Sequence, residues 1–227
     1  MGLIFLFDVD NTLLDHDALK VTLGDALLAS LDGTDVALFW ELYEQVRRDL
    51  GLVSLPETVE RFLPTHCEDP LAPQKLAEVL FHLDLGSCLR PGAVELLRKA
   101  SEFGTTVILS NGDQFFQRWK IWQSGLAEAV GGRVWVFPDK VDHFEDLDSR
   151  FGMDSRFVLV EDKADALAAA QAHWRHRVTT VLVAFGHHAA SDTSGVEVDM
   201  IVGSPAELLA RFGEMLPSGW GDHSSAP

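Results

Sequence analysis

The sequence contains few cysteines, so disulfides contribute little to holding the fold together. Cys67 and Cys88 are the only two among 227 residues, and they form no CxxC pattern. Disulfides persist in oxidising compartments, where small secreted domains carry cysteines at high density. We therefore expect two free thiols and a reducing compartment.

Positive charge is also scarce. Lysine and arginine number 18 against 35 aspartate and glutamate residues, which gives a net charge of -17. Such an excess of acid disfavours binding to nucleic acid or to an anionic membrane surface, because the phosphates of both repel it. A small phosphorylated substrate stays compatible with this charge, since one metal ion and one lysine can set the local field.

Long hydrophobic runs are absent as well. No apolar run approaches the ~18 residues of a membrane span, and the apolar start is too short and lacks the basic flank of a secretion signal. Hydrophobic residues nevertheless make up 47% of the chain, which favours a folded protein over a disordered one. We expect a soluble cytoplasmic protein with one large domain, or one domain with a sizeable insertion.

Strand and helix patterns alternate along most of the chain. Residues 3–7 form an uninterrupted apolar run that predicts a strand buried on both faces. Further strands are expected at residues 105–109, 133–137, 157–160, 179–185 and 199–202, with helical patterns between them. This alternation predicts an α/β fold, with a Rossmann-like parallel sheet and helices on both faces.

The alternation is interrupted between residues 15 and 87, where only helical patterns occur. Pro56 and Pro73 mark the starts of two of the four expected helices, because proline is favoured in the first turn. We therefore predict a core domain of residues 1–14 and 88–216, a small helical domain of residues 15–87, and a flexible tail of residues 217–227.

Polar side chains follow four of the predicted strands. On its own, the Asp8-x-Asp10 pair at the end of the first strand is better explained by a local turn. Ligands of open parallel sheets bind beyond the carboxyl ends of the strands, however, so groups at several such ends can meet in one crevice. The groups in question are Asp8 and Asp10, Ser110 and Asn111, Lys140, and Glu161 and Asp162.

This set of side chains suits phosphoryl chemistry. Several carboxylates around one point repel each other unless a cation lies between them, and oxygen ligands without histidine or cysteine select Mg²⁺. Lys140 would neutralise phosphoryl oxygens and a nucleophilic carboxylate. Ser110 offers a hydroxyl, and Asn111 a backbone N–H at a predicted helix N-terminus. One carboxylate would then attack phosphorus, and a second would move a proton.

The same residues resemble the motifs of the haloacid dehalogenase superfamily. The run DVDNTL from Asp8 to Leu13 looks like its first motif, Ser110-Asn111-Gly112 its second, Lys140 its third and Glu161-Asp162 its fourth. The resemblance covers roughly residues 3 to 213. It implies that the inserted helices form a cap that closes over the site and selects the substrate.

The resemblance also implies a role for each catalytic residue. Asp8 would be the nucleophile. Asp10 would protonate the leaving oxygen and then activate water, with its pKa raised by the bound phosphoryl group. The other implied catalytic residues are Ser110 and Lys140.

The implied ligands follow from the same motifs. Phosphoryl oxygens would be bound by Thr12, Ser110, Asn111 and Lys140. The metal would be held by Asp8, the backbone carbonyl of Asp10, Asp162 and, directly or through water, Glu161. Asp165, one turn further along, is the alternative acid.

These features together predict a Mg²⁺-dependent phosphatase of a small phosphorylated metabolite, acting as a monomer or homodimer through an aspartyl-phosphate. The dehalogenating branch of the superfamily lacks the second acid, so Asp10 favours phosphoryl transfer. Phosphonate cleavage would need a Schiff-base lysine, and neither Lys20 nor Lys75 has the context for one. A phosphomutase, a receiver-like module that accepts phosphate without turnover and a silent scaffold stay open as alternatives.

Two further pairs of residues could approach the site. We expect Arg47 and Arg48 to lie on a solvated helix face, although they are the first candidates among the inserted helices for the anionic end of a substrate. We likewise expect His187 and His188 to lie in a solvated loop after the fifth strand.

Overall fold

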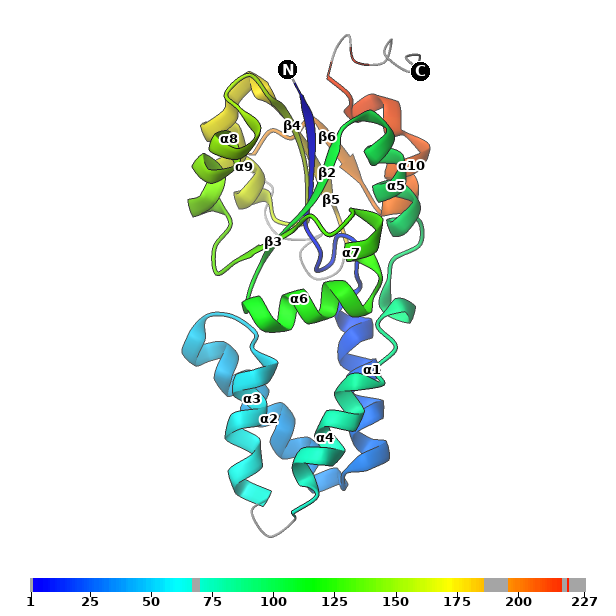
Figure 1. Cartoon of the computed structure of the whole chain (residues 1–227), viewed down its shortest axis with the longest axis vertical. Coiled ribbons are helices and arrows are strands. Elements are labelled where there is room, and N and C mark those ends of the chain that lie inside the picture. Colours follow the sequence, from blue (N-terminus) through cyan, green and yellow to red (C-terminus); the bar gives the residue numbers. More distant parts are fainter. Residues whose placement is uncertain (1, 67–69, 186–195, 218–219, 221–227) are drawn as a thin grey trace.

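A six-stranded parallel sheet forms the centre of the protein (Figure 1). The computed structural model describes residues 2–66, 70–185, 196–217 and 220. The strands lie in the order β3-β2-β1-β4-β5-β6, and each neighbouring pair is parallel. Their bounds are β1 Leu3–Phe7, β2 Thr105–Asn111, β3 Val134–Phe137, β4 Arg156–Glu161, β5 Val178–Val183 and β6 Met200–Val202. This sheet confirms the predicted α/β class.

Strand β1 lies in the middle of the sheet and is buried on both faces, because successive side chains of a strand point to opposite sides. Leu3, Phe5 and Phe7 belong to one hydrophobic core, whereas Ile4 and Leu6 belong to another. Each of these side chains is at most 3% exposed. The uninterrupted apolar run is therefore what a doubly covered central strand requires.

Helices cover both faces of the sheet (Figure 1). Side chains of α5, α6, α7 and α10 pack into the first core, and those of α8 and α9 into the second. The bounds are α5 Ala93–Phe103, α6 Gln114–Gln123, α7 Leu126–Ala129, α8 Phe144–Phe151, α9 Ala164–Trp174 and α10 Pro205–Ala210. Short 3₁₀ turns span Leu63–His66, Gly86–Cys88, Val141–His143, Arg175–Arg177 and Phe212–Met215.

Four helices occupy the stretch between β1 and α5, as the sequence predicts. They are α1 His16–Ser30, α2 Gly33–Leu50, α3 Leu55–Phe62 and α4 Ala72–Phe81. Side-chain oxygens of Asp15, Asp32 and Ser54 accept backbone N–H groups at the starts of the first three, which satisfies donors that a helix leaves unpaired. These helices lie beyond the carboxyl ends of the strands (Figure 1).

The chain enters and leaves the inserted helices through two adjacent segments. Leu14 forms a β-bridge with Leu89. On either side of this bridge, Asp15 N donates to Cys88 O at 2.9 Å and Arg90 N donates to Leu13 O at 2.9 Å. The segments lie close to the predicted boundaries, and the division into two domains stays a prediction. Cys67 and most of the predicted tail lie outside the described residues.

Gly104 caps helix α5, as a glycine after the last apolar position predicts, because its backbone N–H donates to Ala100 O at 3.1 Å. Its backbone is extended, with φ of -174°. A Cβ at this position would lie 2.2 Å from Leu3 O. The glycine is therefore needed for the close approach of the chain to β1.

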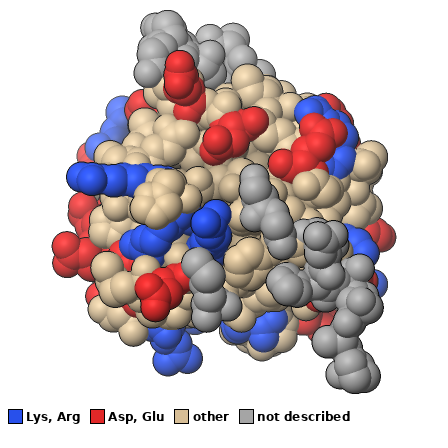
Figure 2. All heavy atoms as spheres, turned by 90° about the horizontal axis from the view of Figure 1, so that it is seen from above, with Lys and Arg blue, Asp and Glu red and all other residues tan. Residues whose placement is uncertain are grey.

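The surface opposite the inserted helices carries both signs of charge. Figure 2 shows this face, where lysine and arginine side chains alternate with aspartate and glutamate. No described helix combines the length and the apolar character that a membrane span requires.

Candidate active site

The carboxyl ends of β1, β2 and β4 bring the predicted polar groups together. Asp8 directly follows β1, and its backbone N–H donates to Val160 O of β4 at 3.0 Å. Ser110 and Asn111 are the last residues of β2, which is two residues longer than predicted, and Glu161 is the last residue of β4. The parallel register places these ends at one edge of the sheet.

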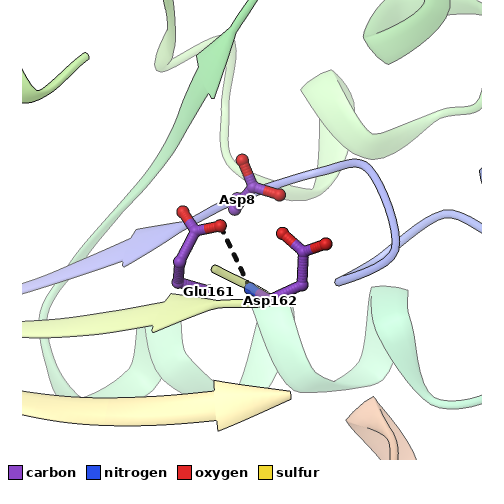
Figure 3. Close-up of side chains that lie close together, drawn as sticks. All are labelled: Asp8, Glu161 and Asp162. Atoms are coloured by element: carbon purple, nitrogen blue, oxygen red, sulfur yellow. Dashed lines mark hydrogen bonds between the residues drawn. The ribbon is translucent and has the colours of Figure 1, made fainter. Parts of the chain in front are cut away.

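Three carboxylates form a buried group at this edge. Asp8, Glu161 and Asp162 each offer an oxygen within 4.8 Å of the others, and their exposed fractions are 6%, 0% and 4%. Figure 3 shows the three side chains converging from the ends of β1 and β4. Asp165 is exposed in the first turn of α9 and lies outside this group.

Lys140 supplies the positive charge next to these acids. Its Nζ lies 2.6 Å from Asp8 Oδ1, forms an ion pair with Glu161 and donates to Leu109 O at 3.3 Å. Its backbone N–H donates to Asn111 Oδ1 at 2.8 Å, which fixes the loop after β3 against β2. Burial lowers the pKa of Lys140, but Asp8 and Glu161 raise it above the ordinary value, so the ammonium stays charged.

One lysine does not balance three acids. Burial and the charge of Glu161 raise the pKa of Asp8 to about 6, although Lys140 opposes this. Burial and the charge of Asp8 raise the pKa of Asp162 to about 9. Glu161 differs: burial would raise its pKa, but Lys140 holds it below the ordinary value. The arrangement therefore gains stability from a further cation.

The donor set fits Mg²⁺. Among the described residues, Asp162 Oδ1 is buried without a hydrogen-bond partner, and Asp162 Oδ2 has only a long contact of 3.4 Å from Asn11 Nδ2. Glu161 is more fully engaged, because its Oε1 accepts the backbone N–H groups of Asp162 and Lys163 at 3.1 Å each. Asp8 and Asp162 are thus the side chains best placed to hold a hard cation. Metal coordination by the backbone carbonyl of Asp10 stays a prediction.

Asp10 is held by residues that the sequence analysis does not identify. Lys120 Nζ lies 2.5 Å from Asp10 Oδ1, Gln117 Nε2 donates to Asp10 Oδ2 at 2.7 Å, and His16 Nδ1 lies 3.4 Å from Oδ1. Burial would raise the pKa of Asp10, but Lys120 and His16 hold it well below its usual range. Asp10 is therefore a carboxylate in the free protein.

Two hydroxyl groups near these acids lack strong partners. Thr12 Oγ1 is buried and finds no hydrogen-bond partner in the part of the chain that the structure describes, and the buried Ser110 Oγ has a contact of 3.5 Å to Asn111 O. Unsatisfied buried hydroxyls are unfavourable unless a ligand pairs with them. Both are thus suited to the predicted binding of phosphoryl oxygens.

Asn111 lies in a different setting from the one expected. It ends β2, whereas α6 begins at Gln114 and its N-terminus is capped by the side chain of Asp113, which accepts Phe116 N. The amide oxygen of Asn111 accepts Lys140 N, and its carbonyl accepts Gln117 Nε2 at 2.8 Å. These bonds position Lys140 and Gln117, and phosphate binding by Asn111 stays a prediction.

A cavity of about 400 Å³ opens onto the acids and extends to the inserted helices. Its lining includes Asp8, Asp10 and Asp162 together with residues of α1 and α2. The lining from these two helices consists of His16, Asp17, Lys20, Tyr43 and Arg47. A second cavity, of about 270 Å³, lies between α3, α4 and α6 with an apolar lining that includes none of the strand-end groups. His187 and His188 lie outside the described residues.

A family model described as haloacid dehalogenase-like hydrolase matches residues 5–194. Among solved structures, a haloacid dehalogenase-like hydrolase from Burkholderia xenovorans LB400 shares 32% sequence identity and a TM-score of 0.77, over 92% of this chain and 97% of that chain. No curated protein matches the chain.

More distant structures share the fold. A HAD-hydrolase from Bacillus subtilis, solved with magnesium, is 17% identical with a TM-score of 0.59, over 92% of this chain and 98% of that chain. L-2-haloacid dehalogenase from Xanthobacter autotrophicus is 17% identical with a TM-score of 0.56, over 95% of this chain and 100% of that chain. These similarities show the fold alone.

Proposed function

Because the chain belongs to the haloacid dehalogenase-like hydrolases, we propose that it is a Mg²⁺-dependent phosphatase acting on a small phosphorylated metabolite through an aspartyl-phosphate. The observation that carries the proposal is the second carboxylate. Asp10 lines the same cavity as Asp8 and is held in place by Lys120 and Gln117. Hydrolysis of an aspartyl-phosphate needs such a group to move protons.

Asp8 is suited to the nucleophilic step. With a pKa of about 6 it is mostly a carboxylate at neutral pH. One of its oxygens attacks phosphorus, and the bond between phosphorus and the leaving oxygen breaks. Lys140, 2.6 Å from Asp8 Oδ1, offsets the negative charge that gathers there.

Asp10 is suited to the two proton transfers. It is ionised in the free protein, and an entering phosphoryl group raises its pKa by like-charge repulsion, so that it takes up a proton. It gives this proton to the leaving oxygen and then removes one from the water that attacks phosphorus. Thr12 and Ser110 supply hydroxyl groups to the phosphoryl oxygens. When bound by Asp8 and Asp162, Mg²⁺ supplies further positive charge to the phosphoryl group.

Other reactions fit the site less well. Dehalogenases have the same fold, but a halide leaves without a proton, so the transfer of a proton from Asp10 to the leaving group would have no use there. A phosphomutase would use the same residues and differ in the contacts that the inserted helices make with the substrate. We further propose a cytoplasmic location, a monomer or homodimer, and no nucleic-acid or membrane partner.

The test is phosphate release from p-nitrophenyl phosphate, measured with Mg²⁺ and with EDTA, for wild type and Asp8→Asn. We expect release only with the metal, and a fall of about 10³-fold or more in Asp8→Asn, because the nucleophile is removed. Circular dichroism and the melting temperature of Asp8→Asn should show an intact fold.

Three outcomes would contradict the proposal. Near wild-type activity in Asp8→Asn would show that Asp8 is not the nucleophile. Activity that survives EDTA would show that the reaction does not need the metal. Absence of release would be followed by a panel of phosphorylated metabolites. If none of them is hydrolysed, a receiver-like module or a silent scaffold replaces the phosphatase.

A further inference from the structure

Part of the wall of the 400 Å³ cavity comes from α1 and α2 and contains two cationic side chains. Lys20 on α1 and Arg47 on α2 both line the cavity. Asp8, Asp10 and Asp162 line it as well. Lys163, next to Asp162, lines it too. The cavity thus combines strand-end acids, suited to a metal and a phosphoryl group, with cationic side chains that come from the inserted helices.

Tyr43 on α2 lies in the same wall with an unused hydroxyl group. The side chain is 2% exposed, and its Oη has no hydrogen-bond partner among the described residues. Burial and the charge of Asp10 raise the pKa of Tyr43, so the phenol stays neutral and can donate. A buried donor without a partner is costly unless a ligand supplies the acceptor.

Lys20 and Arg47 are only partly neutralised. Both pair with the same carboxylate, Glu44, and each contact is long at 3.4 Å. Lys20 Nζ also lies 5.3 Å from the centre of the Tyr43 ring, which holds the ammonium beside the phenol. Asp17 also lines the cavity but is exposed. Long contacts to a half-exposed carboxylate are weak, so Lys20 and Arg47 can exchange them for contacts with a ligand.

We propose that Tyr43, Lys20 and Arg47 bind a second anionic group of the substrate, so that the preferred substrates are small phosphate monoesters with a carboxylate or a second phosphate at their other end. This inference rests on the proposed phosphatase function. The Tyr43 hydroxyl donates to an oxygen of that group, and the two cations balance its charge. A cavity of this volume holds a ligand of metabolite size.

The test uses linear phosphate monoesters of increasing chain length that end in a carboxylate, a phosphate or a neutral amide. Wild type should show a higher kcat/KM for the charged esters than for the amides of equal length. Tyr43→Phe should reduce this ratio about tenfold, because a hydrogen bond to a charged group is lost. Arg47→Ala should reduce it about threefold, since Arg47 is half exposed.

Two further variants sharpen the test. Arg48 is adjacent to Arg47 but exposed and outside the cavity, so Arg48→Ala should leave the ratio unchanged. Glu44→Gln frees both cations and should raise the ratio. The carboxylate and phosphate series then show which anion is preferred.

Binding without turnover separates this inference from the proposed function. Calorimetric titration of Asp8→Asn with the carboxylate and amide esters should give the same preference, and adding Tyr43→Phe should remove most of it. If no ester is hydrolysed yet the preference in binding persists, the phosphatase proposal fails and the anion site stands. Equal binding of charged and neutral esters, or an unchanged preference in Tyr43→Phe, would overturn the anion site.

Discussion

Lys140 and Glu161 form a buried ion pair beside Asp8 and Asp162, the residues proposed as nucleophile and metal ligand. Glu161 is fully buried and bound to Lys140 and to two backbone N–H groups. The Glu161 carboxylate is therefore suited to holding Lys140 and the backbone in position. Asp162, by contrast, has one oxygen for which no described residue is a hydrogen-bond partner. At the scale of single residues, two adjacent acids of one motif have different surroundings and are suited to different functions.

Replacement of Asp10 tests the proton-transfer role. Asp10→Asn keeps the size of the side chain but cannot carry the proton. For an activated ester, whose leaving group needs little protonation, we expect the phospho-enzyme to form and its hydrolysis to slow by about 10²- to 10⁴-fold. Rapid mixing with p-nitrophenyl phosphate should then show a burst of one p-nitrophenol per enzyme before a slow steady state.

A matched control for this burst is Asp25→Asn, which makes the same change at an exposed position of α1 outside the cavity. It should show wild-type turnover. Fast steady-state hydrolysis in Asp10→Asn would mean that another group activates the water, and Asp10 would then be a positioning residue for Lys120 and Gln117.

The sequence reveals the strand-end acids but not the side chains that hold Asp10. Asp8, Lys140 and Glu161 follow apolar strands, and a parallel sheet makes such ends converge. Gln117 and Lys120 reach the site from inside α6. Their spacing of three residues places them on one helix face. Which face turns towards the sheet depends on tertiary packing. The sequence itself shows only that two polar residues lie three apart among the apolar residues of this helix.

At the scale of elements, sequence patterns locate these helices well. The spacing of apolar residues predicts helices at residues 93–103 and 164–174, and α5 and α9 have these bounds. Strand β2 runs two residues further, because Ser110 and Asn111 pair with β3 although neither is apolar. Helix α7, with four residues, is too short to show a period and was not predicted.

One buried carboxylate joins α8 to the end of α9 and to the 3₁₀ turn Arg175–Arg177. Asp148 on α8 accepts His173 Nε2 at 2.7 Å, Arg177 Nη1 at 2.9 Å and Trp174 Nε1 at 3.2 Å. Burial would raise the pKa of Asp148, but Arg177 and His173 hold it below the ordinary value. The side chain is 8% exposed, so these bonds are well shielded from solvent.

Replacement of Asp148 should destabilise the protein in a pH-dependent way. An acid whose pKa is lower in the folded state adds stability above its unfolded pKa of about 4, and this contribution is lost as the pH falls through the folded pKa. Asp148→Asn should therefore cost about 2 kcal/mol of unfolding free energy at neutral pH. The difference from wild type should shrink below about pH 4.

Denaturant titrations at several pH values measure this difference. Asp146→Asn is the control on the same helix, because Asp146 is 66% exposed and pairs only with His143 three residues earlier. It should change the free energy by less than about 0.5 kcal/mol. An equal effect of the two variants would show that the Asp148 bonds add nothing beyond surface charge.

The inserted helices and the sheet share one hydrophobic core at the scale of the whole molecule. The cluster that contains Phe5 and Phe7 of β1 also contains Leu23 of α1 and Phe39 of α2. Ser54 Oγ further donates to Asp113 Oδ2 at 3.1 Å, which joins the starts of α3 and α6. Because the sheet and the inserted helices share this core, we expect a ligand that binds the acids to stabilise both against unfolding.

Mg²⁺ should raise the melting temperature of the whole protein. A ligand at about 100 times its Kd adds about 2.7 kcal/mol to the unfolding free energy if it binds only the folded state. For a chain of this size that corresponds to a shift of about 5–10 °C. Differential scanning calorimetry with Mg²⁺ and with EDTA at pH 8 measures the shift, and needs no substrate.

Asp162→Asn should abolish this shift while stabilising the metal-free protein. The pKa of Asp162 is raised to about 9 in the folded state. The free energy of unfolding of the metal-free protein therefore falls as the pH rises from about 4 towards 9. A neutral amide removes that repulsion, and with it the charge that attracts the metal. Asp165→Asn, an exposed acid outside the group, should keep the full shift. If Asp165→Asn loses the shift and Asp162→Asn keeps it, the metal lies nearer the first turn of α9 than the three buried carboxylates predict.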